Sequence, residues 1–131
     1  MNPLQSFTRE PIYAAIFAFW QSLTVGGAPA FKTATRKTRH WDDVSADDQP
    51  ALLQMQRREI AKYRKGLPTI WDCEISLFLY VRSNQLIDPS NVASSILNPL
   101  LDAIVNAIVV DDITTNTCTL GGLVSHCAIE G

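Results

Sequence analysis

Residues 69–82, TIWDCEISLFLYVR, are the most regularly patterned stretch of this 131-residue sequence. Apolar and polar positions alternate, as expected where successive side chains of a β-strand point to opposite faces of a sheet. The stretch predicts a strand whose buried face comprises Trp71, Cys73, Ile75, Leu77, Leu79 and Val81. Phe78 and Tyr80 interrupt the polar face, so we expect them to form a second packing surface, within the chain or against another subunit.

A second strand is expected immediately upstream, where Ala51, Leu53 and Met55 alternate with other residues. The chain then runs through the basic stretch RREIAKYRK, residues 57–65, and GLP at residues 66–68 turns it back. The sequence therefore predicts a hairpin with a basic tip. Farther upstream, residues 31–41 mix β-prone threonines with lysines and arginines, which predicts a polar strand at a sheet edge or against a partner.

Two apolar stretches outside this region predict helices. Thr8 is expected to cap the first, with Phe7 as a hydrophobic staple, and the glycine pair at residues 26–27 ends it. The second begins at Asp88 and Pro89 and repeats apolar residues at helical spacing through residue 108. Its internal proline, Pro99, is expected to kink the helix or to restart it. Residues 119–129 then read as a last strand.

These elements predict one α+β domain spanning residues 1–131. Two main helices pack on one face of a mixed or antiparallel sheet of about four strands. The longest apolar stretches, residues 12–20 and 100–110, fall short of the roughly 20 residues that cross a bilayer. The N-terminus also lacks the order of a secretion signal. We expect a protein of the reducing cytoplasm with no membrane partner.

The cysteines and histidines do not form a recognisable chemical motif. An odd number of cysteines without Cys-x-x-Cys spacing argues against a disulfide framework and a zinc site. His40 and His126, the only histidines, match no ligand or nucleophile spacing. A hydrolase using one of them remains a distant alternative. We therefore expect no catalytic residue and no enzyme activity.

The acidic and glycine-rich segments likewise carry no motif for a bound ion or cofactor. The four aspartates between residues 42 and 48 lack the alternation and the central glycine of a calcium loop. Neither glycine pair, at residues 26–27 and 121–122, leads into a phosphate-binding helix. We expect a solvated acidic loop, two backbone bends, and neither metal nor cofactor.

Charge is unevenly distributed along the chain. Residues 32–65 hold nine basic and five acidic residues, a balance of +4, whereas the rest holds two basic and eight acidic residues, a balance of −6. This segregation favours head-to-tail packing between subunits, because unlike faces attract. The basic hairpin with Tyr63 also fits a small nucleic-acid-binding module, although such proteins are usually strongly basic and this chain has a net charge of −2.

A series of segments in this order resembles the tail terminator, or tail completion, proteins of tailed bacteriophages. No segment is a chemical motif by itself, so the resemblance lies in the series and covers most of the chain. The segments are residues 11–17, 39–44, 49–52, 65–68, 97–104 and 119–127. Similar proteins continue past the equivalent of Gly131 into further strand, so we expect an open sheet edge here.

The resemblance implies a structural virion protein located at the tail or neck, and in the host cytoplasm during assembly. Such subunits form a ring, commonly of six, that caps the tail tube and ends its polymerisation. The ring's other face docks the head–tail connector or neck protein, and DNA passes through the lumen without being read. The resemblance implies neither enzyme activity nor a cofactor.

The matching positions give a predicted set of interface residues. The polar strand and the basic hairpin are expected to contact neighbouring subunits or the tube, and the aromatic pair extends this surface. The set comprises Arg36, Lys37, Arg39, Trp41, Arg57, Arg58, Lys62, Arg64, Lys65, Phe78 and Tyr80.

Overall fold

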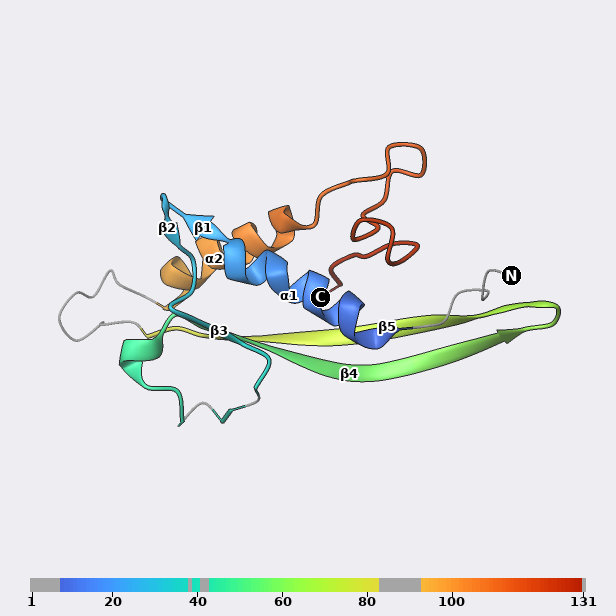
Figure 1. Ribbon diagram of the computed structural model, residues 1–131. Coiled ribbons are helices and arrows are strands. Elements are labelled where there is room, and N and C mark those ends of the chain that lie inside the picture. Colours follow the sequence, from blue (N-terminus) through green and yellow to red (C-terminus); the bar gives the residue numbers. More distant parts are fainter. Residues whose placement is uncertain (1–7, 38, 41–42, 83–92, 131) are drawn as a thin grey trace.

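The computed structural model describes residues 8–37, 39–40, 43–82 and 93–130. Its dominant feature is a long antiparallel hairpin of β4 (Ala51–Arg64) and β5 (Leu67–Tyr80), on whose base two helices lie side by side (Figure 1). The helices are α1 (Arg9–Ser22) and α2 (Ala93–Ala107). The chain is therefore α+β, as predicted, with both helices on one face of the sheet.

The main sheet is mixed and has three strands in the order β3-β4-β5. The short β3 (Thr33–Thr35) runs parallel to the first residues of β4, pairing Thr33 with Ala51. A separate two-stranded ribbon, β1 (Thr24–Val25) and β2 (Ala28–Pro29), follows α1. Gly26 and Gly27 form its turn with positive φ angles. The predicted backbone bend is therefore the turn of a small hairpin.

Two strand predictions need correction. The polar strand expected over residues 31–41 is reduced to three residues, and Trp41 lies outside the described residues. The last strand expected over residues 119–129 is wrong, because this segment consists of turns with one isolated bridge between Cys118 and Cys127. Leu120, Gly121 and Gly122 all have positive φ angles, which a β-strand does not accommodate. Within the described residues, the main sheet thus lacks the predicted fourth strand.

The helix ends differ in detail from the prediction. Thr8 occupies the N-cap position of α1, but its side chain makes no capping hydrogen bond. Pro99 lies inside α2 without ending or restarting it. The expected staple residue Phe7 and the expected start of the second helix at Asp88 and Pro89 lie outside the described residues. No helix in the described part of the chain is long and apolar enough to cross a membrane.

The core lies between the helices and the base of the hairpin. Trp20 of α1, Leu52 of β4, and Leu100 and Ile104 of α2 are buried together, and Leu77 and Leu79 of β5 pack against them. The first four residues of β4 are buried, since a second cluster covers the opposite face of the sheet. That cluster joins Val44, Ala51 and Leu53 with Tyr80 packed against them. The base of the hairpin is thus covered on both faces.

Candidate interaction surface on the hairpin

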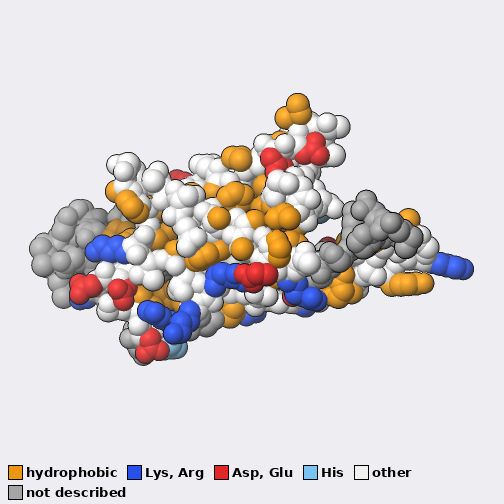
Figure 2. Space-filling view, in the orientation of Figure 1, with side chains coloured by type: hydrophobic (Ala, Val, Ile, Leu, Met, Phe, Trp, Pro, Cys, Tyr) orange, Lys and Arg blue, Asp and Glu red, His pale blue; other side chains and the backbone are white. Residues whose placement is uncertain are grey.

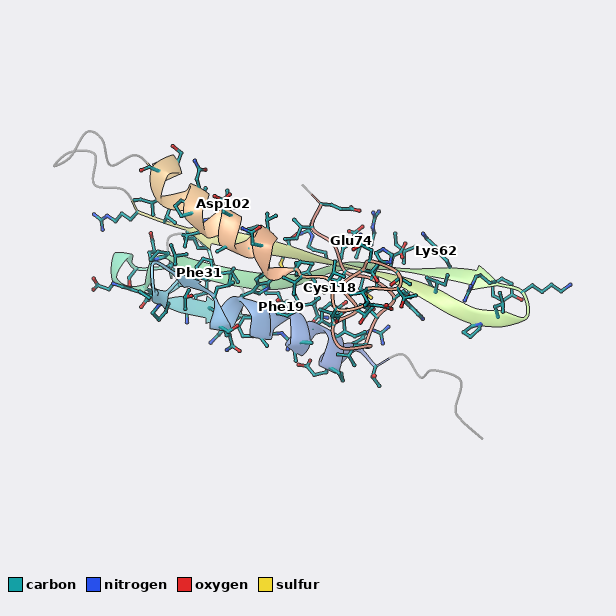
Figure 3. All side chains as sticks on the ribbon, turned by 90° about the horizontal axis from the view of Figure 1, so that it is seen from above. Phe19, Phe31, Lys62, Glu74, Asp102 and Cys118 are labelled. Atoms are coloured by element: carbon teal, nitrogen blue, oxygen red, sulfur yellow. The ribbon has the colours of Figure 1, made fainter. Side chains whose placement is uncertain are left out.

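The end of the hairpin leaves this core and projects past both helices (Figure 3). We call residues 57–74 the arm. Strands this long arise because neither residues 51–64 nor residues 67–80 contain an internal glycine, and Gly66, with a φ angle of 74°, forms the turn. Arg64 braces this turn by donating two hydrogen bonds, of 3.1 Å and 2.8 Å, to the carbonyl oxygen of Pro68.

A β-bulge at the start of the arm exchanges the two faces of β4. Gln56 pairs with Ile75, but Glu59 pairs with Cys73, so Arg57 and Arg58 together oppose Glu74. Opposite residues of antiparallel strands share a face. The bulge therefore turns Glu59 to the helix side of the sheet, whereas unbroken alternation with Gln54 would point it outward.

The first turn of α1 holds the base of the arm through this residue. The Arg9 guanidinium donates to the Glu59 carboxylate at 2.7 Å and lies 5.4 Å from the centroid of the Trp71 ring. Each contact is partly exposed and contributes about 1 kcal/mol or less. Together they join α1 to both strands of the hairpin, so the arm emerges from the domain in a defined direction.

Two cross-strand ion pairs link the strands of the arm. Arg58 contacts Glu74 at 3.0 Å, and Lys62 contacts Asp72 at 2.6 Å. All four side chains are largely exposed, so each pair adds little to stability. Their effect is on charge: they neutralise two of the five basic side chains in the predicted hairpin surface. Arg57, Arg64 and Lys65 retain no acidic partner among the described residues.

The arm also exposes large apolar side chains. Tyr63 is 82% exposed and Leu67 is 60% exposed, and Ile70 is exposed as well. Leu67 and Ile70 lie opposite Arg64 and Lys62, so these four residues share the face that points away from the helices. We call this face the outer face of the arm. Figure 2 shows a basic group at the far end of the projection and hydrophobic groups along its lower surface.

Of the polar residues of the β3 region, Arg36 reaches the strand position just before the arm. Arg36 is bound within the chain, since it contacts both Glu10 of α1 and Gln56 of β4. The hydrogen bond from Arg36 lowers the pKa of Glu10 below its ordinary value. Lys37 is exposed and Arg39 is half-buried. The structure therefore places Arg36 next to the base of the arm rather than at its end.

The aromatic pair divides between two surroundings. Tyr80 packs within the chain against Val44, and its hydroxyl donates to the Arg39 carbonyl oxygen at 3.4 Å. Phe78, on the same face of β5, is 38% exposed. The sequence left open whether Phe78 and Tyr80 pack within the chain or against another subunit. Tyr80 packs within the chain, and Phe78 is the more exposed of the two.

Ion pairs within the chain neutralise part of the charge that is segregated along the sequence. Three basic residues of the middle segment pair with acids of the flanks, and Glu59 of the middle segment pairs with Arg9 of the N-terminal flank. Opposite charges placed far apart in the sequence meet across the hairpin and against α1. Exposed charge remains at the basic arm end, at Lys32 and Lys37, and in the acidic C-terminal region.

A buried polar cluster lies where α1 meets the arm. Tyr13 is almost fully buried and its hydroxyl has no hydrogen-bond partner in the described structure. Burial, with Cys73 and Glu59 nearby, raises the pKa of the Tyr13 hydroxyl strongly. Burial likewise raises the pKa of the Cys73 thiol. Both groups are therefore held in their neutral forms, which suits packing rather than nucleophilic chemistry.

The remaining candidates for chemistry are dispersed. His40 and His126 are exposed. Cys118 and Cys127 face each other across a bridge and are free thiols. Among the residues that the structure describes, no three His, Cys, Asp or Glu side chains are grouped to hold a metal ion.

The sequence pattern missed part of this surface. Leu67 and Ile70 belong to the exposed arm, but they read as a turn residue and as an ordinary strand residue. Arg9 could not be connected to Glu59, because the bulge that turns Glu59 inward has no signal in the alternation. The glycine turn and the length of the uninterrupted strands were the available clues to a projecting arm.

Comparison with known proteins finds no match: no family model, no curated protein and no solved structure is similar to this chain.

Proposed function

We propose that this chain is a structural subunit that assembles with copies of itself and acts as a phage tail terminator. In this role a ring of subunits caps the tail tube and ends its polymerisation. The ring's other face docks the head–tail connector, and DNA passes through the lumen. The proposed role is in the virion and involves no catalysis.

The observation that carries this proposal is the arm. A chain of 131 residues extends the distal part of its longest hairpin away from its own core and exposes Tyr63, Leu67 and Ile70 on it. Leaving such side chains in water forfeits roughly 1.5–3 kcal/mol each relative to burial. A partner that covers them recovers this free energy. The arm therefore supports a role in assembly, and the order of sequence segments supports the tail terminator assignment.

The open edge of β5 supports the same proposal. In the described part of the chain, β5 pairs with β4 alone, so its other edge presents unpaired backbone groups over the length of the strand. Such edges template the addition of a strand from another chain. The charges on the arm prevent indiscriminate pairing, as lysines and arginines do on other exposed edges.

The direct test is tube growth. Purified tail-tube protein of the same phage is polymerised with and without this protein, and tube lengths are measured by negative-stain electron microscopy. We expect shorter tubes with a ring at one end, and normal tube lengths with the Leu67→Ser/Ile70→Ser variant. Tubes of unchanged length, with no ring at either end, contradict the proposal.

A nucleic-acid-binding module is the second candidate, and the exposed Tyr63 between Lys62 and Arg64 favours it. Aromatic rings flanked by cations stack on bases and contact phosphates. This reading requires binding that weakens steeply with salt, and Arg57→Ala and Arg58→Ala should each reduce the salt slope by about one. Fluorescence anisotropy with a labelled single strand measures this slope. Absence of binding at low salt excludes the module.

A further inference from the structure

The outer side of α2 is the second unpartnered surface of the molecule. Leu100 and Ile104 are buried against the hairpin, whereas Leu101 and Val105 are exposed on the other side of the helix. Residues four apart in a helix lie on one side, so Leu101 and Val105 share a side of α2. Val105 is 56% exposed. Leu101 and Val105 define what we call the α2 stripe.

The charged group beside the α2 stripe is acidic. Asp102 is the only charged residue of α2 and is exposed next to Leu101. No lysine or arginine follows Arg82 in the sequence, while five acidic residues do. The arm is the opposite: after its internal ion pairs are formed, Arg57, Arg64 and Lys65 remain without acidic partners in the described structure.

The two surfaces are similar in character. The outer face of the arm presents Leu67 and Ile70 beside basic groups, three residues or roughly 10 Å apart at about 3.3 Å per residue. The α2 stripe presents Leu101 and Val105 beside an acidic group, four residues or roughly 6 Å apart at 1.5 Å per residue. An apolar pair on each surface and charges of opposite sign make the two surfaces complementary.

One molecule cannot make this contact with itself. The arm end and α2 lie at opposite ends of the molecule in both views, and Lys62 and Asp102 mark the two regions in Figure 3. A contact between unlike surfaces of identical chains is heterologous, and it repeats from copy to copy, forming a ring where the rotation closes. The occupant of the α2 stripe is then a second copy of this chain.

We infer that the outer face of the arm of one subunit docks on the α2 stripe of the next. This inference rests on the proposed self-assembly and names the two surfaces that make it. Leu67 and Ile70 contact Leu101 and Val105, and the basic arm end lies against the acidic side of α2. Charge steers the encounter, and burial of the apolar rows holds the pair together.

Two double variants test the inference, each with one defective surface. The arm variant is Lys65→Glu/Leu67→Ser, and the helix variant is Asp102→Lys/Val105→Ser. The altered side chains are exposed, so circular dichroism and thermal melting should match the wild type. A matched control, Lys32→Glu/Ile113→Ser, changes an exposed cation and an exposed apolar residue outside both surfaces.

Assembly is measured by light scattering under the conditions in which the wild type assembles, alone or with tail-tube protein. We expect each defective variant to require at least tenfold higher concentration to assemble, and the control to behave like the wild type. A mixture of the two defective variants should form a pair with the mass of two chains. The helix variant supplies the arm and the arm variant supplies the stripe, so one intact contact forms and cannot propagate.

The outcomes separate this inference from the proposed function. If the helix variant assembles like the wild type, the α2 stripe is not the docking site, although self-assembly stands. If the two defective variants fail singly and also fail to pair, the contact is not between these two surfaces. If the wild type assembles neither alone nor with tail-tube protein, both the proposed function and this inference are wrong.

Discussion

At the scale of single residues, Gln54 is the polar group on which the core depends. Its amide is 2% exposed and bridges two sites on α1: it accepts a hydrogen bond of 2.9 Å from the Trp20 indole and donates one of 3.1 Å to the Tyr13 carbonyl oxygen. A polar residue within the buried start of β4 is tolerated because both of its hydrogen-bonding functions are satisfied. It fixes α1 against the sheet.

Gln54→Ala should therefore destabilise the protein. The substitution leaves the buried Trp20 N–H without its acceptor, at a cost of about 1–3 kcal/mol, and adds the loss of packing. We expect the free energy of unfolding in urea to fall by about 2–4 kcal/mol. Gln56→Ala, at an exposed position on the same strand, is the control and should change it by less than about 1 kcal/mol. Equal losses in both variants contradict the role of Gln54.

Asp111 organises the C-terminal segment at the same scale. Its carboxylate accepts N–H bonds from Gly121 at 2.9 Å and from Thr119 at 2.7 Å, and the Thr119 hydroxyl donates at 2.9 Å. These bonds, that from Gly121 first, lower the pKa of Asp111 because they stabilise the ionised form. They tie the residues after α2 to the turn at residues 119–122.

The fold of this segment should accordingly depend on pH in the acid range. A carboxyl group whose pKa is lowered on folding contributes stability above its ordinary pKa and loses that contribution as pH falls through the lowered value. We expect the NMR signal of the Gly121 amide to titrate with a midpoint below that of an ordinary aspartate. Asp111→Asn should abolish this titration, and Asp102→Asn should leave it unchanged. A titration that survives in Asp111→Asn assigns it to another group.

At the scale of elements, the hairpin was the most predictable part of the fold. Period-2 alternation over residues 69–82 placed β5 to within two residues at each end, and the glycine turn at Gly66 correctly placed its partner. The bulge opposite Glu74 was not predictable, because Arg57 and Arg58 fit a strand in either register. The contact between α1 and the arm depends on this single inserted residue, so the sequence indicated the strands without indicating how α1 holds them.

For the C-terminal segment, the sequence predicted a strand that the structure does not contain. Residues 119–129 contain enough apolar and β-branched residues to suggest a strand, yet three successive residues adopt positive φ angles. Two of them are glycines, which reach that region at little cost, and the chain turns instead of extending. The hydrogen bonds of Asp111 stabilise this turn. They join residues that are too far apart in the sequence for a local pattern to reveal.

Pro99 provides a test at the element scale. A proline inside a helix cannot donate to the carbonyl of residue 95 and crowds it, at a cost of about 3 kcal/mol relative to alanine. The packing of Leu100 and Ile104 outweighs this cost in α2. Pro99→Ala should raise the free energy of unfolding by about 1–3 kcal/mol in urea titrations. Asn98→Ala, the neighbouring control, should change it by a few tenths, and no gain from Pro99→Ala contradicts this account.

At the scale of the whole molecule, the central claim is that the arm makes this chain a subunit rather than a self-sufficient domain. The charge segregation seen in the sequence pointed toward contacts between subunits. The structure assigns three of the nine basic residues in the middle segment to ion pairs within the chain. Assembly is therefore supported by the exposed apolar residues of the arm and by its basic residues that have no acidic partner in the described part of the chain.

The most direct test is the mass of the purified protein in solution, by light scattering coupled to size exclusion. The chain has a mass of 14.5 kDa, and we expect a particle of about six chains, alone or on addition of tail-tube protein. The Leu67→Ser/Ile70→Ser variant should elute as a folded single chain in both conditions. A wild-type protein that stays at the mass of one chain in both conditions would contradict the account.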